Sequence, residues 1–142
     1  MSTKKEQAIN DIMNSFREMA NLTLGQLSML EKLMSISDED SFNSLMISMK
    51  ETENKIDNYE VVISEQFTNT IVLYQPLASD VRKIVACYRM TINLERISDR
   101  IMNMIRIVSK IRHSPEYVQI VALINNMLTS GALMVEKSLL SF

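Results

Sequence analysis

Residues that interrupt regular structure are scarce in this chain of 142 residues. Glycine and proline occur only twice each, and tryptophan is absent. So few breakers leave little room for the many tight turns of an all-β protein. Apolar residues make up 46% of the sequence and recur along its whole length, which argues against disorder. Length and composition together predict a single all-α domain, residues 1–142, long enough to bury a core.

The sequence also has one cysteine, one histidine and a small net charge. The single Cys87 excludes an intramolecular disulfide and fits a reducing compartment. The formal net charge is -2 and no basic arm stands out, which argues against a nucleic-acid partner. The first residues are polar, and no uninterrupted apolar run reaches the roughly 20 residues of a spanning helix. These features predict a cytoplasmic protein that binds no nucleic acid.

Apolar residues recur every three or four positions over four long stretches, the spacing of one face of a helix. The predicted helices cover about residues 3–33, 38–74, 77–112 and 115–142. Pro76 and Pro115 separate the later ones, because proline suits the first turn of a new helix and disfavours helical geometry just before it. The breaks are short, so neighbouring helices must run antiparallel, as in an up-down helical bundle.

Two smaller features concern the first two helices. Ser37, followed by three acidic residues, is predicted to cap the second helix with its hydroxyl group. Gly25 interrupts the first helix and is predicted to permit either a close helix approach or a small bend.

Four acidic residues are predicted to meet across the hairpin that turns at Pro76. Residues equidistant from the turn lie opposite each other, so their numbers sum to about 152. Glu53 pairs with Asp99 in this way, and Asp57 pairs with Glu95. Each helix carries its two acids four positions apart, on one face. The hairpin geometry therefore places all four carboxylates at one level.

Clustered carboxylates repel one another unless positive charge compensates. A hard divalent or trivalent cation with oxygen ligands, such as Fe, Mn, Mg or Ca, would compensate. Zinc with soft ligands is disfavoured, because no cysteine or histidine lies at useful spacing. The alternative is a solvated salt-bridge face in which nearby basic side chains neutralise the acids. These basic residues are Lys50, Lys55, Arg96 and Arg100.

Catalytic motifs are missing from the sequence. There is no glycine-rich phosphate loop, and His113 is the only histidine, so no Ser/His/Asp or Cys/His set is available. The Glu-x-x-His motif of di-iron helical bundles is absent as well. We therefore predict a protein that is not an enzyme, with a carboxylate-bridged metalloenzyme as the weakest alternative.

Two segments of the third predicted helix resemble the PhoU family. Residues 75–82 read QPLASDVR and residues 94–99 read LERISD, close to the Q-P-x-A-x-D-[LV]-R and L-E-R-I-G-D segments of PhoU repeats. The resemblance implies a three-helix repeat with a metal-binding face formed by Glu53, Asp57, Glu95 and Asp99. It also implies a structural motif at the turn, formed by Pro76, Asp80 and Arg82. Ser98 departs from the family's glycine at that position.

The resemblance further implies a regulator of phosphate transport and phosphate-starvation signalling that acts by binding. Its expected partners are a phosphate transporter, a sensor kinase or both, which would make it peripheral to the membrane through the transporter. PhoU-like chains usually carry two repeats, whereas this sequence holds one repeat and a fourth helix, which looks like the start of a second repeat. The fourth helix is expected to close a four-helix bundle or to complete a homodimer. A metal-free helical dimerisation module is the alternative function.

Overall fold

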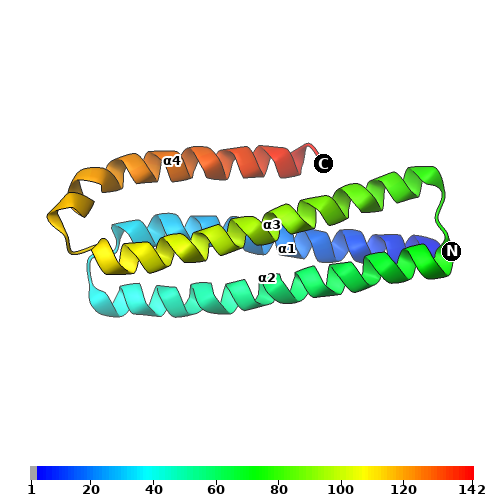
Figure 1. Cartoon of the computed structure of the whole chain (residues 1–142), viewed down its shortest axis with the longest axis horizontal. Helices are drawn as coiled ribbons and strands as arrows, with labels where there is room; N and C mark the ends of the chain where they lie inside the picture. Colours follow the sequence, from blue (N-terminus) through cyan, green and yellow to red (C-terminus); the bar gives the residue numbers. More distant parts are fainter. Residues whose placement is uncertain (1–2) are drawn as a thin grey trace.

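The computed structural model describes residues 3–142, which fold into four helices with no strand among them (Figure 1). The helices are α1 (Lys4–Ser35), α2 (Glu39–Tyr74), α3 (Ala78–Ile111) and α4 (Pro115–Leu140). The all-α class and the helical bundle predicted from the sequence are confirmed. Each helix begins and ends within two residues of its predicted limits.

The start of α2 differs from the prediction by one residue. Asp38, not Ser37, is the N-cap, and its carboxylate accepts a hydrogen bond from the Ser41 backbone N–H at 2.8 Å. A carboxylate satisfies a free backbone donor and also interacts favourably with the positive end of the helix dipole. Hydrogen bonding by Ser41, from its side chain first and its backbone N–H second, lowers the pKa of Asp38. Ser37 instead offers its backbone carbonyl to the Arg112 guanidinium, at 3.0 Å.

The connection between α2 and α3 is a tight turn. Gln75 adopts a left-handed conformation with φ 41° and closes α2 by donating its N–H to the Ile71 carbonyl at 3.3 Å. Pro76 follows and prevents the helix from continuing. Leu77 then begins α3 without a side-chain cap. The short turn makes α2 and α3 an antiparallel hairpin with a fixed register.

A second contact fixes the opposite end of the bundle. The Arg112 guanidinium, just after α3, lies 3.8 Å from the centre of the Phe42 ring in α2. Its Nη1 atom lies 3.3 Å from a carboxylate oxygen of Glu39. Because Phe42 is almost fully buried, this cation–π contact ties the end of α3 to the start of α2.

The three-helix core is divided into two apolar clusters. One lies toward the Pro76 turn, and the other lies toward the α1–α2 connection. The first includes Ile12, Phe16, Met19, Ile56, Ile63 and Ile84. The second includes Leu30, Leu33, Phe42, Met49, Ile101 and Ile105. On all three helices, buried polar residues occupy the positions between the clusters. This polar layer consists of Thr23, Gln26, Glu53 and Ser98.

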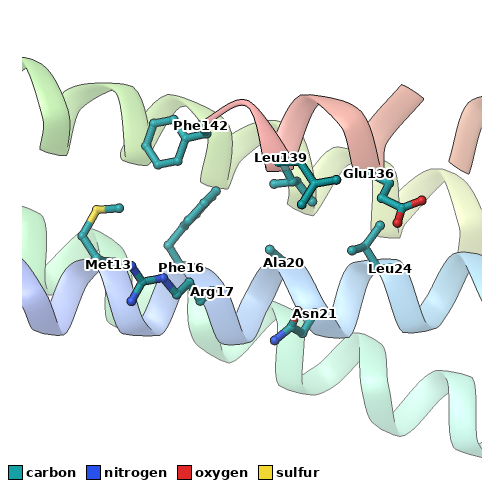
Figure 2. Close-up of a pocket in the computed structure, with 10 residues that line it drawn as sticks. Met13, Phe16, Arg17, Ala20, Asn21, Leu24, Glu136, Leu139 and Phe142 are labelled. Atoms are coloured by element: carbon teal, nitrogen blue, oxygen red, sulfur yellow. The ribbon is translucent and has the colours of Figure 1, made fainter. Parts of the chain in front are cut away.

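Helix α4 lies along one side of the three-helix unit, packed on α1 and away from α2 (Figure 1). At its start the Tyr117 hydroxyl donates a hydrogen bond to the Met34 carbonyl at 3.4 Å. After its end the ring of Phe142 meets Phe16 edge to face, with centroids 5.4 Å apart (Figure 2). Leu139 lines the pocket beside this pair. Two anchors therefore hold α4 antiparallel to α1.

Helix α4 is more apolar than the sequence analysis indicated. Although it has no uninterrupted apolar run of 20 residues, its length and its low charge are those of a helix able to cross a membrane. The residues of its most apolar stretch are not buried in the structure. The core helix of a soluble protein can have the same length and composition.

Gly25 does not serve the close approach proposed from the sequence. A methyl group placed on its Cα would meet no other atom within 4 Å. Glycine costs a helix interior roughly 0.5–1 kcal/mol relative to alanine, because it loses more backbone freedom on folding. We therefore expect Gly25→Ala to raise the free energy of unfolding by about this amount, measured by urea denaturation. Ala122→Gly, at an exposed site of α4, serves as the reverse control. A loss of stability in Gly25→Ala would show that the glycine is needed.

Candidate functional site: an acidic face on α2 and α3

The hairpin brings the four acidic residues singled out by the sequence into one electrostatic neighbourhood. Partial burial raises the pKa of Asp57, and the negative charges of Glu53 and Asp99 raise it further. The pKa of Glu95 is likewise raised, first by burial and then by the charge and a hydrogen bond of Asp99. Since α2 supplies two of these acids and α3 the other two, the charges interact both within and between the helices.

A fifth carboxylate, Glu60, belongs to the same face and was missed by the sequence analysis. Its negative charge contributes to the raised pKa of Glu95. The signal was present, because Glu60 follows Asp57 by three positions and Glu53 by seven and so shares their side of α2. The acidic face is hereafter the set Glu53, Asp57, Glu60, Glu95 and Asp99.

One basic side chain, that of Lys50, forms an ion pair with the acidic face in the described part of the chain. The Lys50 Nζ atom lies 2.6 Å from the Glu53 Oε2 atom, and this hydrogen bond raises the pKa of Lys50. Within residues 3–142, no other side chain forms an ion pair with a member of the face. Arg96 and Arg100 instead line a groove beside α4. The salt-bridge arrangement considered from the sequence is therefore present at Glu53, but the other four carboxylates carry no such partner.

The side chains of the acidic face are close but do not form a closed cage. Over the described part of the chain, no group of three or more His, Cys, Asp or Glu side chains is gathered tightly enough to hold a metal ion. The donors are nevertheless hard carboxylate oxygens, as Mg²⁺, Ca²⁺ and Mn²⁺ prefer. Burial is the first cause of the raised pKa values of Asp57 and Glu95, and the negative charges of neighbouring acids add to it. The residues present therefore fit a hard cation in chemistry, and binding would require side-chain rearrangement.

The polar layer adds unsatisfied oxygen atoms beside this face. Ser98 lies between Glu95 and Asp99 in sequence, and its hydroxyl is fully buried without a hydrogen-bond partner among the described residues. Gln26 donates its amide to the Met49 carbonyl at 2.9 Å, but its own side-chain oxygen has no partner there either. Buried polar atoms are usually paired, so these two oxygens are available to a further donor or cation.

The turn motif of Pro76, Asp80 and Arg82 lies at the far end of the hairpin, roughly 30 Å from the acidic face at 1.5 Å per residue. The Asp80 carboxylate lies 3.5 Å from the Lys5 Nζ atom and so joins the starts of α1 and α3. Arg82 is exposed and takes part in no ion pair within residues 3–142. The structure therefore gives Asp80 a contact between helices at this end, and the part of Arg82 in the turn motif stays a prediction.

Comparison with protein-family models matched the PhoU domain over residues 5–108. This range includes α1 from its second residue, all of α2 and all but the last three residues of α3, and it leaves α4 outside. Searches of curated proteins and of solved structures gave no significant match.

The raised pKa values predict a pH-dependent stability. Asp57 and Glu95 hold their protons more tightly in the folded state than in the unfolded state. Protonation of these two carboxyl groups therefore stabilises the fold. This stabilisation is fully present below the pKa that the groups have in the unfolded state, and it is lost as the pH rises through their raised pKa in the folded state. We expect the double variant Asp57→Asn, Glu95→Gln to be more stable than the wild type at about pH 7 and little different at about pH 4.

Urea unfolding at the two pH values measures this difference. Glu51→Gln, which removes an exposed carboxylate of α2 outside the acidic face, is the control and should show no such gain. The lowered pKa of Asp38 makes its own contribution to stability rise with pH, opposite to that of Asp57 and Glu95. This contribution cancels when the variants are compared with the wild type, because Asp38 is present in all of them. Equal stability differences at both pH values would contradict the electrostatic coupling.

Proposed function

Because the chain belongs to the PhoU domain family, we propose that it regulates phosphate transport and phosphate-starvation signalling by binding rather than by catalysis. The match over residues 5–108 carries this proposal, since it covers the three helices that form the core and the acidic face. Proteins of this family are regulators, not enzymes, and are generally soluble in the cytoplasm. The proposed place of action is therefore the cytoplasmic side of a membrane transport system.

The acidic face is the proposed site for a hard divalent or trivalent cation such as Fe, Mn, Mg or Ca. Glu53, Asp57, Glu95 and Asp99 would hold it, with Glu60 beside them. The support is the hard carboxylate oxygens brought together from α2 and α3, whose pKa values at Asp57 and Glu95 are raised by burial and then by the neighbouring negative charges. A bound cation would offset these negative charges. The contact from Lys50 is to the Oε2 atom of Glu53, so the other carboxylate oxygen would be the one offered to the cation.

The proposed partners are a phosphate transporter, a sensor kinase or both. A cation shared by α2 and α3 would hold the two helices at one separation, and the exposed side chains of those helices would then form a defined docking surface. Binding to a transporter would place the protein at the membrane without requiring a helix of its own to enter it.

A metal-free interaction module is the second candidate function, and one observation favours it. The Lys50–Glu53 contact of 2.6 Å already neutralises the most buried member of the acidic face. In this alternative the remaining carboxylates stay hydrated, and α2 and α3 bind a partner helix or basic surface directly.

Metal binding distinguishes these two functions. We expect the wild type to take up Mn²⁺, Mg²⁺, Ca²⁺ or Fe²⁺ in stoichiometric amount by equilibrium dialysis with elemental analysis. An ion at 100 times its dissociation constant should stabilise the fold by about 2.7 kcal/mol, seen as a raised melting temperature that chelator reverses. Glu95→Gln combined with Asp99→Asn should lose both effects and keep its helicity.

Glu51→Gln is the matched control, because it removes a carboxylate of α2 but none from the acidic face. Stoichiometric metal in the Glu95→Gln, Asp99→Asn variant would refute the site. A melting temperature that no ion raises would favour the metal-free module.

The regulatory role is tested by affinity capture of the tagged chain from phosphate-replete host cells in mild detergent. We expect mass spectrometry to identify phosphate-transporter subunits or a sensor kinase, and their recovery to fall in phosphate-starved cells. Recovery of neither protein class under either condition would contradict the phosphate-regulating role, whatever the outcome of the metal experiment.

A further inference from the structure

Helix α4 has a second apolar stripe that the fold leaves uncovered. Its inner side, anchored by Tyr117 and Leu139, packs on α1. A separate set of apolar side chains, spaced three, four and seven positions apart, shares another side of the helix. This outer stripe consists of Ile120, Leu123, Met127 and Met134, which are 41–70% exposed. Large apolar side chains gathered on one helix face mark an interaction surface.

The outer stripe borders an apolar groove between α3 and α4. A cavity of about 430 Å³ lies between Ile107 and Ile111 of α3 and Ile124 and Met127 of α4, over Leu27 of α1. Ile107 itself is 58% exposed. Helix α4 packs on α1 and makes little direct contact with α3, so the groove is open to solvent along its length.

The groove continues toward the middle of α3 and becomes positively charged there. A second cavity of about 420 Å³ shares Leu27, Met104 and Leu128 with the first, and its far end is lined by Arg96 and Arg100. Neither arginine takes part in an ion pair within residues 3–142. The groove therefore has an apolar lining and a positively charged end, which suit an apolar helix that carries an acidic residue at one end.

Helix α4 of this same chain has those two properties. Glu116 stands four positions before Ile120, on the side of the helix that carries the outer stripe. Glu116 is exposed and has no ion-pair partner within the described chain. We propose that a second copy of the chain fills the groove, in a two-fold dimer in which the two α4 helices run antiparallel and cross at Met127.

The geometry of an antiparallel pair supports this register. With Met127 on the two-fold axis, Ile120 of one copy lies opposite Met134 of the other. Leu123 then lies opposite Gly131, whose missing side chain leaves room for it and which has nothing within 4 Å of an added Cβ. The same contacts occur twice, as a two-fold interface requires.

The register also brings the opposite charges together. Glu116 of the second copy falls at the level of Ser138, ten residues and about 15 Å beyond Leu128. Leu128 and Met104 line the same part of the groove, and α3 runs opposite to α4. The level of Ser138 on α4 therefore corresponds to a position ten residues before Met104 on α3. That position is Leu94, two residues from Arg96. Arg96 and Arg100 therefore lie within reach of the glutamate, while the apolar stripes cover each other.

Solution mass tests the proposal. We expect the full chain to form dimers by sedimentation equilibrium, and Met127→Glu to raise the dissociation constant at least tenfold or so, because it places two like charges on the axis. Val118→Glu is the matched control, since Val118 is 72% exposed on another side of α4, and it should leave the dissociation constant unchanged. Circular dichroism checks that every variant stays helical.

Cross-linking tests the register. Met127→Cys should give covalent dimers with a short bismaleimide. Val118→Cys should not, because the two Val118 positions would be about 27 Å apart along the axis. Cys87 is fully buried and does not compete for the reagent. Glu116→Arg should weaken the dimer, and adding Arg96→Glu and Arg100→Glu should restore it.

Three results would overturn the proposal. The first is a monomer at every concentration. The second is a dimer that Met127→Glu leaves intact. The third is binding of monomers to neutral phosphatidylcholine vesicles that Met127→Glu abolishes, because the outer stripe would then cover itself with lipid.

Discussion

The arrangement of this protein depends on the register of α2 against α3. Gln75 and Pro76 end one helix and begin the next within a few residues, so every later pair of facing positions is determined by its distance from that turn. The register places Glu53 and Asp57 opposite Asp99 and Glu95, and it aligns the polar positions of the core at one level. At the other end, the contact of Arg112 with the Phe42 ring joins the end of α3 to the start of α2. A shift by one turn would disperse both the acidic face and the polar layer.

The fold could be predicted from the sequence because its signals are local and repeated. Apolar spacing gave the four helices, and the two prolines marked the breaks. The four acids could be placed together because a short turn leaves little freedom in a hairpin. Glu60 was missed because the position opposite it across the turn is Ile92, so no pair of acids singles it out. The Asp38 cap was missed because two neighbouring residues can each cap a helix, and tertiary contacts decide between them.

Other features depended on three-dimensional packing that the sequence does not encode locally. Gly25 has open space around it, which spacing along the helix cannot reveal. Arg96 and Arg100 are near the acids in sequence but line the groove beside α4, because helix rotation turns them away. The distribution of charge around α3 is therefore two-sided, with carboxylates toward α2 and guanidinium groups toward α4.

The polar layer has a consequence for how the bundle opens. Thr23, Gln26, Glu53 and Ser98 separate two apolar clusters, each of which stabilises its own half of the same three helices. Cooperative unfolding depends on apolar contacts across the boundary between the clusters, and here the buried positions at that boundary are polar. Helix α4 covers the half next to Pro76 only as far as the contact of Phe142 with Phe16, and the hairpin turn itself lies beyond the end of α4 (Figure 1). The acidic face sits at this boundary, so neutralising its charge would act on the coupling between the halves as much as on either one.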